Sequence, residues 1–121
     1  MLKRKITYTD FDGNERSEDF YFNLTKAELT ELQFSQEGGF QERLERIVAA
    51  KDQPAIIAEF KKLILLSYGE KSDDGRHFNK SKEISDRFSH TEAYSTLFME
   101  LATDADKAAE FVKSVLPHIE G

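Results

Sequence analysis

The chain has no cysteine and no tryptophan among its 121 residues, and only two prolines. Without cysteine, disulfide bridges and thiolate metal sites are excluded, and a reducing compartment is permitted. The longest apolar runs, such as residues 63–66, have four residues, whereas a membrane-spanning helix needs about 18 or more. The basic N-terminal residues are not followed by an apolar segment, so no signal peptide is expected. We therefore expect a soluble, intracellular protein that forms a single domain over residues 1–121.

Clustered positive charge is also scarce. The net charge is −6, and residues 91–121 alone carry six acids and two bases. Nucleic-acid binding draws most of its affinity from grouped lysine and arginine side chains, and the bases here are spread singly. Nucleic acid is therefore not an expected partner. Phenylalanine, by contrast, is abundant with 10 residues, which is a generous supply of large apolar side chains for so charged a chain.

Residues 4–22 have the pattern of a β-hairpin. Ile6 and Tyr8 alternate with two threonines, residues 12–14 (Asp-Gly-Asn) supply turn residues, and residues 20–22 (Phe-Tyr-Phe) continue the second strand. Since an apolar residue at every second position faces one side of a strand, the hairpin should bury one face.

The register of this hairpin can be argued from the opposed side chains. A two-residue loop would place Asp10 opposite another acid, which is unfavourable. A three-residue loop ending at Asn14, a residue that tolerates the left-handed conformation, instead places Asp10 opposite Arg16 and Ile6 opposite Phe20. We predict the second register.

The rest of the chain, residues 25–116, is predicted to form about six short helices. They cover residues 25–34, 40–49, 54–67 and 82–88, with two closing helices over 90–116. N-caps are expected at Thr25, Ser81, Ser89 and Thr103. Gly69 should stop the third helix. Residues 70–81 read as a polar loop, with a tight turn at Asp74-Gly75 and Phe78 as a buried anchor.

Metal binding has little support in the sequence. Residues 10–14 (Asp-Phe-Asp-Gly-Asn) resemble the start of a calcium loop, but the glycine stands fourth rather than sixth and the twelfth position is Tyr21 instead of an acid. His77, His90 and His118 are the only histidines, and none has another at i+3 or i+4. A charged hairpin turn and surface or capping histidines are the favoured readings, and no metal or other cofactor is expected.

Catalytic patterns are equally weak. There is no Gly-x-Ser-x-Gly motif and no glycine-rich phosphate loop ending in Lys-Ser or Lys-Thr. Neighbouring carboxylates such as Asp73-Asp74 are explained by a turn, and the pair Asp104 and Asp106 by the first turn of a helix. We therefore expect a protein that binds a partner and is not an enzyme.

Six segments, taken in order, carry a resemblance to a known family: Tyr8–Arg16, Asp19–Leu29, Ala55–Ile57, Phe60–Ser72, Asp73–Ser81 and Thr91–Asp104. Together they resemble the tail assembly chaperones of long-tailed (siphovirus-type) bacteriophages that infect Gram-positive bacteria. The likeness spans nearly the whole chain and includes no catalytic motif.

The resemblance implies a non-virion helper in the host cell cytoplasm. Such proteins bind the tape measure protein and keep its long apolar helices soluble while tail tube subunits polymerise around it. Many are also made in a longer form by a programmed translational frameshift, so the implied partners include the tail tube protein and a longer form of the chain itself. Self-association along the tape measure protein is a further expectation, with the hairpin edge as its contact.

The prediction is thus an α+β, mainly α domain, with an N-terminal hairpin (4–22) packed on a helical part (25–116). We expect the helices over 40–49, 54–67 and 90–116 to offer apolar grooves to tape measure helices. The predicted contact residues are Phe40, Leu44, Phe60, Tyr94 and Phe98, and these rings and side chains could instead belong to the core. Two alternatives stay open: a structural virion protein, such as a head–tail connector or another tail component, and a small regulator or enzyme.

Overall fold

The computed structural model describes residues 1–35, 42–43, 46, 49–51 and 53–117. The elements along these residues are β1 (Leu2–Thr9), β2 (Glu15–Phe22), α1 (Lys26–Ser35), α3 (Gln53–Ser67), β3 (Tyr68–Lys71), β4 (Phe78–Asn79), α4 (Lys82–Ser89), α5 (Glu92–Thr103) and α6 (Ala105–Val115). The predicted α+β, mainly helical class is confirmed. The described residues hold five helices rather than about six. The predicted helix over 40–49 falls mainly on residues outside the description.

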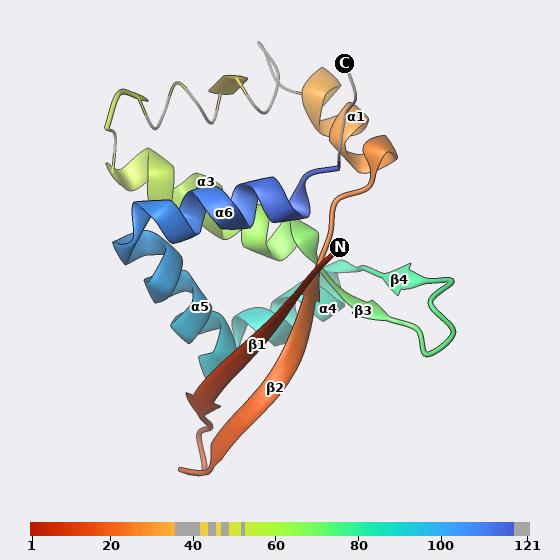
Figure 1. The fold of residues 1–121 in the computed structure, drawn as a ribbon, viewed down its shortest axis with the longest axis vertical. Helices are drawn as coiled ribbons and strands as arrows, with labels where there is room; N and C mark the ends of the chain where they lie inside the picture. Colours follow the sequence, from red (N-terminus) through yellow and green to blue (C-terminus); the bar gives the residue numbers. More distant parts are fainter. Residues whose placement is uncertain (36–41, 44–45, 47–48, 52, 118–121) are drawn as a thin grey trace.

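The strands form one antiparallel sheet in the order β1-β2-β3-β4, which leaves β1 at an edge. Figure 1 shows the β1–β2 hairpin extending from the helices, with α5 beside β1 and the short β3–β4 hairpin projecting separately. The helices thus cover one end of the long hairpin, and its turn lies away from them.

The predicted hairpin is confirmed, but its predicted register is wrong by two residues. Ile6 lies opposite Glu18 rather than Phe20, and Tyr8, not Asp10, lies opposite Arg16. The backbone N–H of Asp10 donates to the carbonyl of Asn14 at 2.9 Å, so the loop comprises residues 11–13. Its length is three residues, as predicted, but Gly13 and not Asn14 takes the left-handed position, with φ +84°. Because the shift is even, every side chain keeps its predicted face.

Two of the four predicted N-caps are confirmed. The Thr25 hydroxyl accepts a hydrogen bond from the Glu28 backbone while the Glu28 carboxylate accepts one from the Thr25 backbone, a complete capping box. Ser81 caps α4 by accepting from the backbone of Ile84 at 3.1 Å.

The caps predicted at Ser89 and Thr103 are wrong, because both residues belong to the preceding helix. The Ser89 hydroxyl donates to the Asp86 carbonyl and the Thr103 hydroxyl to the Met99 carbonyl, both at 2.7 Å. The actual caps are Thr91 for α5 and Asp104 for α6. Each lies one or two residues further along, where the backbone is already extended.

The predicted loop over 70–81 contains most of a second hairpin. α3 runs directly into β3, which pairs with β2 through Gly69 opposite Tyr21 and with β4 through Lys71 opposite Phe78. Gly69 is therefore a strand residue and not a helix stop. A Cβ at this position would lie 2.7 Å from the Phe78 ring, so glycine is required by close approach. The predicted turn at Asp74-Gly75 is confirmed, with Gly75 at φ +76°.

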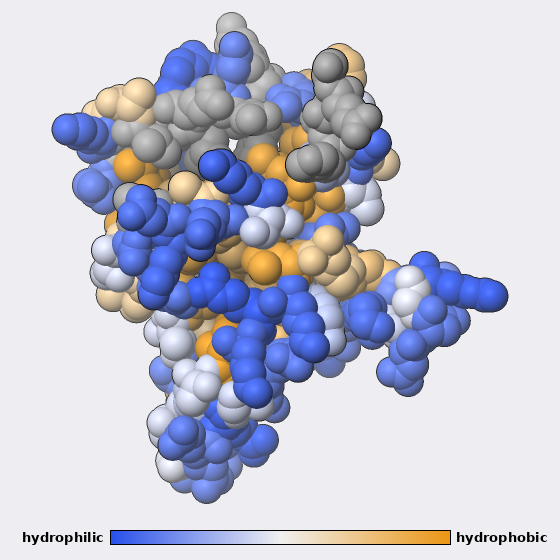
Figure 2. Space-filling model, viewed as in Figure 1, coloured by the Kyte–Doolittle hydropathy of each residue, from blue (hydrophilic) through white to orange (hydrophobic). Residues whose placement is uncertain are grey.

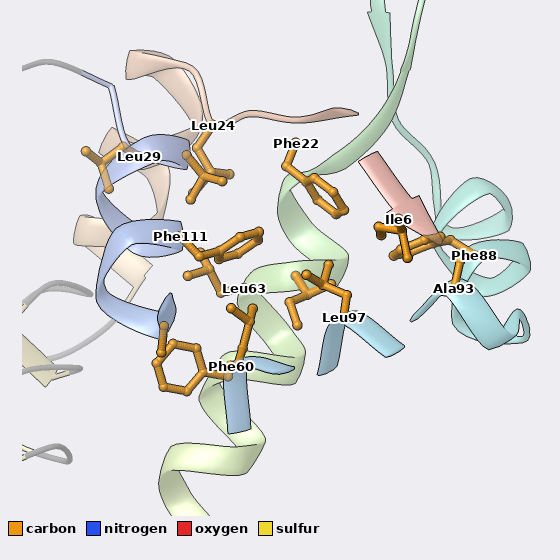
Figure 3. Close-up of a cluster of buried hydrophobic side chains, with 14 residues drawn as sticks. Ile6, Phe22, Leu24, Leu29, Phe60, Leu63, Phe88, Ala93, Leu97 and Phe111 are labelled. Carbon is orange, nitrogen blue, oxygen red and sulfur yellow. The ribbon is translucent and has the colours of Figure 1, made fainter. Parts of the chain in front are cut away.

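The core lies where the sheet base meets the helices. Figure 3 shows Phe22 of β2 and Phe111 of α6 pointing toward Leu63 of α3 and Leu97 of α5. The Phe22 ring is 5.5 Å from that of Phe111 and makes an edge contact with it. The buried apolar side chains are Ile6, Phe22, Leu24, Leu29, Phe60, Leu63, Ile64, Phe88, Ala93, Leu97, Leu101, Ala108, Phe111 and Val115.

A polar clamp joins the segments beside this core. The Lys80 ammonium donates to the Asn23 carbonyl at 2.5 Å and to the Glu28 carboxylate at 2.7 Å. Partial burial by itself would raise the pKa of Glu28, but the hydrogen bonds from Lys80 and Thr25 outweigh it and the pKa is lowered. The clamp therefore holds the start of α1 against the connection that leads into α4.

Candidate partner-binding surface

The segment that resembles a calcium loop is a hydrogen-bonded turn. The Asp10 carboxylate accepts from the backbones of Asp12 and Asn14 at 3.0 and 2.9 Å and from Arg16 Nε at 2.5 Å. The hydrogen bond from Arg16, followed by those from the backbone, lowers the pKa of Asp10. Its oxygens thus accept hydrogen bonds from the protein itself. This supports the interpretation of the segment as a charged hairpin turn rather than a calcium loop. In the described part of the chain, no three His, Asp or Glu side chains gather as a metal site would require.

The five predicted contact residues fall into three groups. Phe40 and Leu44 lie outside the described residues. Phe60 is 8% exposed and forms part of the core, so a partner could reach it only if the core opened. Tyr94 and Phe98 are half-buried on α5 and pack against the core. Of the predicted contact residues that the structure describes, Tyr94 and Phe98 are therefore the two that a partner could reach.

Tyr94 and Phe98 lie at the flank of the buried face of α5. Three small or aliphatic residues, Ala93, Leu97 and Leu101, point into the core. The Tyr94 ring stands edge-on to Phe88 of α4 at 5.8 Å and lies 6.0 Å from the Phe98 ring. Burial raises the pKa of the Tyr94 phenol, so the hydroxyl stays protonated over the neutral range. The pair is therefore an uncharged, aromatic border between core and solvent.

The exposed side of α5 carries no charge. Its exposed residues are Ser95, Thr96, Met99, Ala102 and Thr103. Glu100, which is half-buried, is ion-paired with Arg4 of β1 and with Lys107 of α6, the latter at 3.3 Å. Every other helix in the described chain exposes charged side chains. Since the centres of protein interfaces are depleted of charge, this difference marks α5 as the candidate partner-binding element.

We define the α5 strip as Tyr94, Ser95, Phe98, Met99 and Ala102. Tyr94, Phe98 and Ala102 recur at i, i+4 and i+8, so they lie along one line of the helix. Met99 is 53% exposed and stands beside this line. Methionine is unbranched and adapts to partners of varied shape. The strip is thus an uncharged, mostly apolar and adaptable surface suited to another helix.

The remaining large apolar residues that are exposed stand on other elements. Among the described residues they are Met1, Phe11, Phe34, Ile57 and Leu66. In the face seen in Figure 2, hydrophobic side chains gather over the helices, and both hairpins are largely hydrophilic toward their ends. The helical part is therefore the better site for an apolar partner.

Met99 and Ala102 were not predicted as contacts. A signal for them was present, because residues 93–99 contain no charged residue in a chain of which 33% is charged. Helical periodicity does not distinguish this signal from core packing, since an apolar stripe on a short helix is commonly its buried face.

A model of the phage tail assembly chaperone family matches residues 1–119. Neither a curated protein nor a solved structure matches the chain. The helices of the described residues include none with both the length and the hydropathy to cross a bilayer.

Proposed function

Since the chain belongs to the phage tail assembly chaperone family, we propose that it binds the tape measure protein in the host cytoplasm. It keeps the apolar helices of that protein soluble during tail tube assembly and does so without catalysis. The family predicted from the sequence is confirmed. The siphovirus type of tail and the Gram-positive host stay predictions.

One observation of the structure carries the proposal: α5 exposes a mostly apolar strip, and the solvent side of this helix carries no charge. An apolar helix of the tape measure protein could lie along Tyr94, Phe98 and Ala102, in the manner of helices that dock by residues one turn apart. The backbone of α5 is already fixed by the core, so binding would cost little ordering of the chaperone.

The strip is also small enough for a reversible contact. Burying one large apolar side chain completely contributes about 1.5–3 kcal/mol, and Tyr94 and Phe98 are already half-buried. A single copy should therefore bind weakly. Many copies along one apolar rod would hold it in solution together, and each could leave as a tail tube subunit arrives.

The test is co-expression with the tape measure protein. The double variant Met99→Glu/Ala102→Glu places two carboxylates on the strip at exposed positions, so the fold should persist while binding is lost. The control is Ala109→Glu, which adds a carboxylate at an exposed position of the neighbouring helix α6. We expect the wild type and the control to keep the tape measure protein soluble and to co-purify with it, and the double variant to leave it insoluble.

Two outcomes would contradict the proposal. One is a double variant that solubilises the tape measure protein as well as the wild type does. The other is the presence of the chain in purified mature virions, detected by mass spectrometry, which would indicate a structural tail or connector component.

A further inference from the structure

The turn of the β1–β2 hairpin presents an exposed aromatic ring, and two exposed acids nearby in sequence have no ion-pair partner among the described residues. Phe11 is 76% exposed. Asp12 follows it in the loop and Glu15 is the first residue of β2; both are exposed and have no Lys or Arg within ion-pair distance in the described part of the chain. We call Phe11, Asp12 and Glu15 the hairpin tip. A partner that covered this ring would remove its apolar surface from water, which favours association.

The hairpin tip is also held in one shape. Gly13 takes the left-handed conformation, and the Asp10 carboxylate ties together the backbones of Asp12 and Asn14 and the side chain of Arg16. Further from the turn, the hydroxyls of Thr7 on β1 and Ser17 on β2 form a hydrogen bond with each other at 3.1 Å. A ring on a preorganised turn loses little entropy on binding, which is the property of an interface anchor.

A surface of complementary character lies on α3. Ile57, Ala58, Lys61, Lys62 and Leu66 are all exposed and lie on the side of α3 that faces away from the core. Ile57 is 43% and Leu66 37% exposed. Neither lysine has a carboxylate within ion-pair distance among the described residues. We call these five residues the α3 face.

The two surfaces match in charge and in hydropathy. The hairpin tip offers one aromatic ring with two carboxylates, and the α3 face offers aliphatic side chains with two ammonium groups, none of them ion-paired among the described residues. Within one molecule they cannot meet, because the tip lies at the end of the hairpin away from the helices (Figure 1). Complementary charges at the edge of an apolar contact set its orientation and speed association.

We propose that the hairpin tip of one copy docks on the α3 face of a second copy. The contact joins two different surfaces, so it leaves a free tip on one partner and a free α3 face on the other, and can repeat in a row. It is separate from the α5 strip and does not depend on the identity of the tape measure protein as partner.

The test uses the purified full chain alone, followed by sedimentation velocity over a concentration series. The wild type should associate as its concentration rises, and added salt should weaken the association. Phe11→Ser and, separately, Lys61→Glu/Lys62→Glu should each weaken it at least tenfold. Phe34→Ser, which removes an exposed ring from α1 (86% exposed), is the control and should associate as the wild type does.

The size of the complex formed when the two variants are mixed is the decisive measurement. Phe11→Ser keeps an intact α3 face, and Lys61→Glu/Lys62→Glu keeps an intact tip, so an equimolar mixture should form dimers and nothing larger. Placing Asp12→Lys and Glu15→Lys together with Lys61→Glu and Lys62→Glu in one chain should restore association.

The proposal is overturned if the wild type stays monomeric up to about 1 mM, the range of weak contacts, or if both variants associate like the wild type. It is equally overturned if Phe11→Ser loses tape measure binding while its self-association is unchanged, since the tip would then serve that partner. A failure of self-association leaves the co-expression result untouched, so the two proposals fail separately.

Discussion

At the base of the β1–β2 hairpin, Phe22 has no exposed surface and packs against Phe88 and Phe111. At the tip of the same hairpin, Phe11 is mostly exposed and the structure depends on the Asp10 carboxylate and on Gly13. One element thus has a base fixed by apolar burial and a tip fixed by local hydrogen bonds. The base belongs to the stability of the whole domain, whereas the tip can change without affecting the core.

This difference separates residues available for binding from residues that hold the fold. Phenylalanine alone does not distinguish them, because Phe11 and Phe22 are the same residue type on one hairpin. Their surroundings decide, and four predictions about stability test whether the division holds.

The largest effect is expected from Phe22→Ala. Removal of a fully buried ring should lower the free energy of unfolding by about 3–5 kcal/mol, a large share of the stability of a small domain. The matched change at the tip, Phe11→Ala, should alter it by less than about 0.5 kcal/mol. Urea unfolding followed by circular dichroism measures both. Equal losses for the two variants would remove the distinction between base and tip.

An intermediate effect is expected from Lys80→Met, which removes the clamp at the base. Loss of the hydrogen bonds to Asn23 and Glu28 should cost about 1–3 kcal/mol at pH 7. The control is Lys82→Met, which loses an exposed ion pair with Asp86 and should cost less than about 0.5 kcal/mol.

The pH dependence of the Lys80 effect has a definite sign. The pKa of Glu28 is lowered in the folded state, so the contribution of its carboxylate is complete above the unfolded pKa of about 4.3 and is lost as pH falls through the folded value. The difference between wild type and Lys80→Met should therefore shrink in unfolding measured at about pH 3. A difference that stays constant with pH would show that Glu28 contributes nothing to the clamp.

Apart from the control variants, the smallest effect is expected from Gly13→Ala at the tip. An alanine Cβ there would meet nothing within 4 Å, so the cost comes from the left-handed backbone alone, about 1 kcal/mol. Gly75→Ala in the β3–β4 turn has the same open surroundings and a similar φ of +76°, so it should cost about the same. Thermal unfolding of the two variants compares them directly. A much larger loss at Gly13 would show that the tip is coupled to the core.

Features set by neighbouring residues could be predicted from the sequence. The capping box of Thr25 and Glu28, the Ser81 cap and the turn at Asp74-Gly75 each depend on contacts within a few residues. The hairpin, its faces and its loop length were predicted for the same reason. Its register was wrong because glycine and asparagine both tolerate the left-handed position, and the hydrogen bonds of Asp10 decided between them.

Features that depend on distant partners could not be predicted. Residues 68–71 form a strand because β2 offers them an edge, and nothing local to Tyr68-Gly69-Glu70-Lys71 indicates that neighbour. Phe78 was predicted as an anchor, but its role beside Gly69 needs the pairing of β3 with β4. The absence of charge from the exposed side of α5 was visible in the sequence, but which side is exposed became clear only from the packing.

The predicted contact residues also depend on distant neighbours that the sequence does not reveal. Helical spacing placed Phe60 and Phe98 on apolar stripes, but burial distinguishes Phe60 in the core from Phe98 at its border. The tail tube protein and a longer frameshifted form stay predictions as partners.

The link between the two ends of the described chain has a consequence for synthesis in the cell. The backbone N–H of Leu24 donates to the carbonyl of Val115 at 3.0 Å, and the Phe22 ring packs on Phe111. While a ribosome is still translating α6, the Phe22 ring lacks its contact with Phe111. The nascent polypeptide therefore completes this interior only once α6 has been made, and proteases would meet a product truncated before α6 as an open substrate.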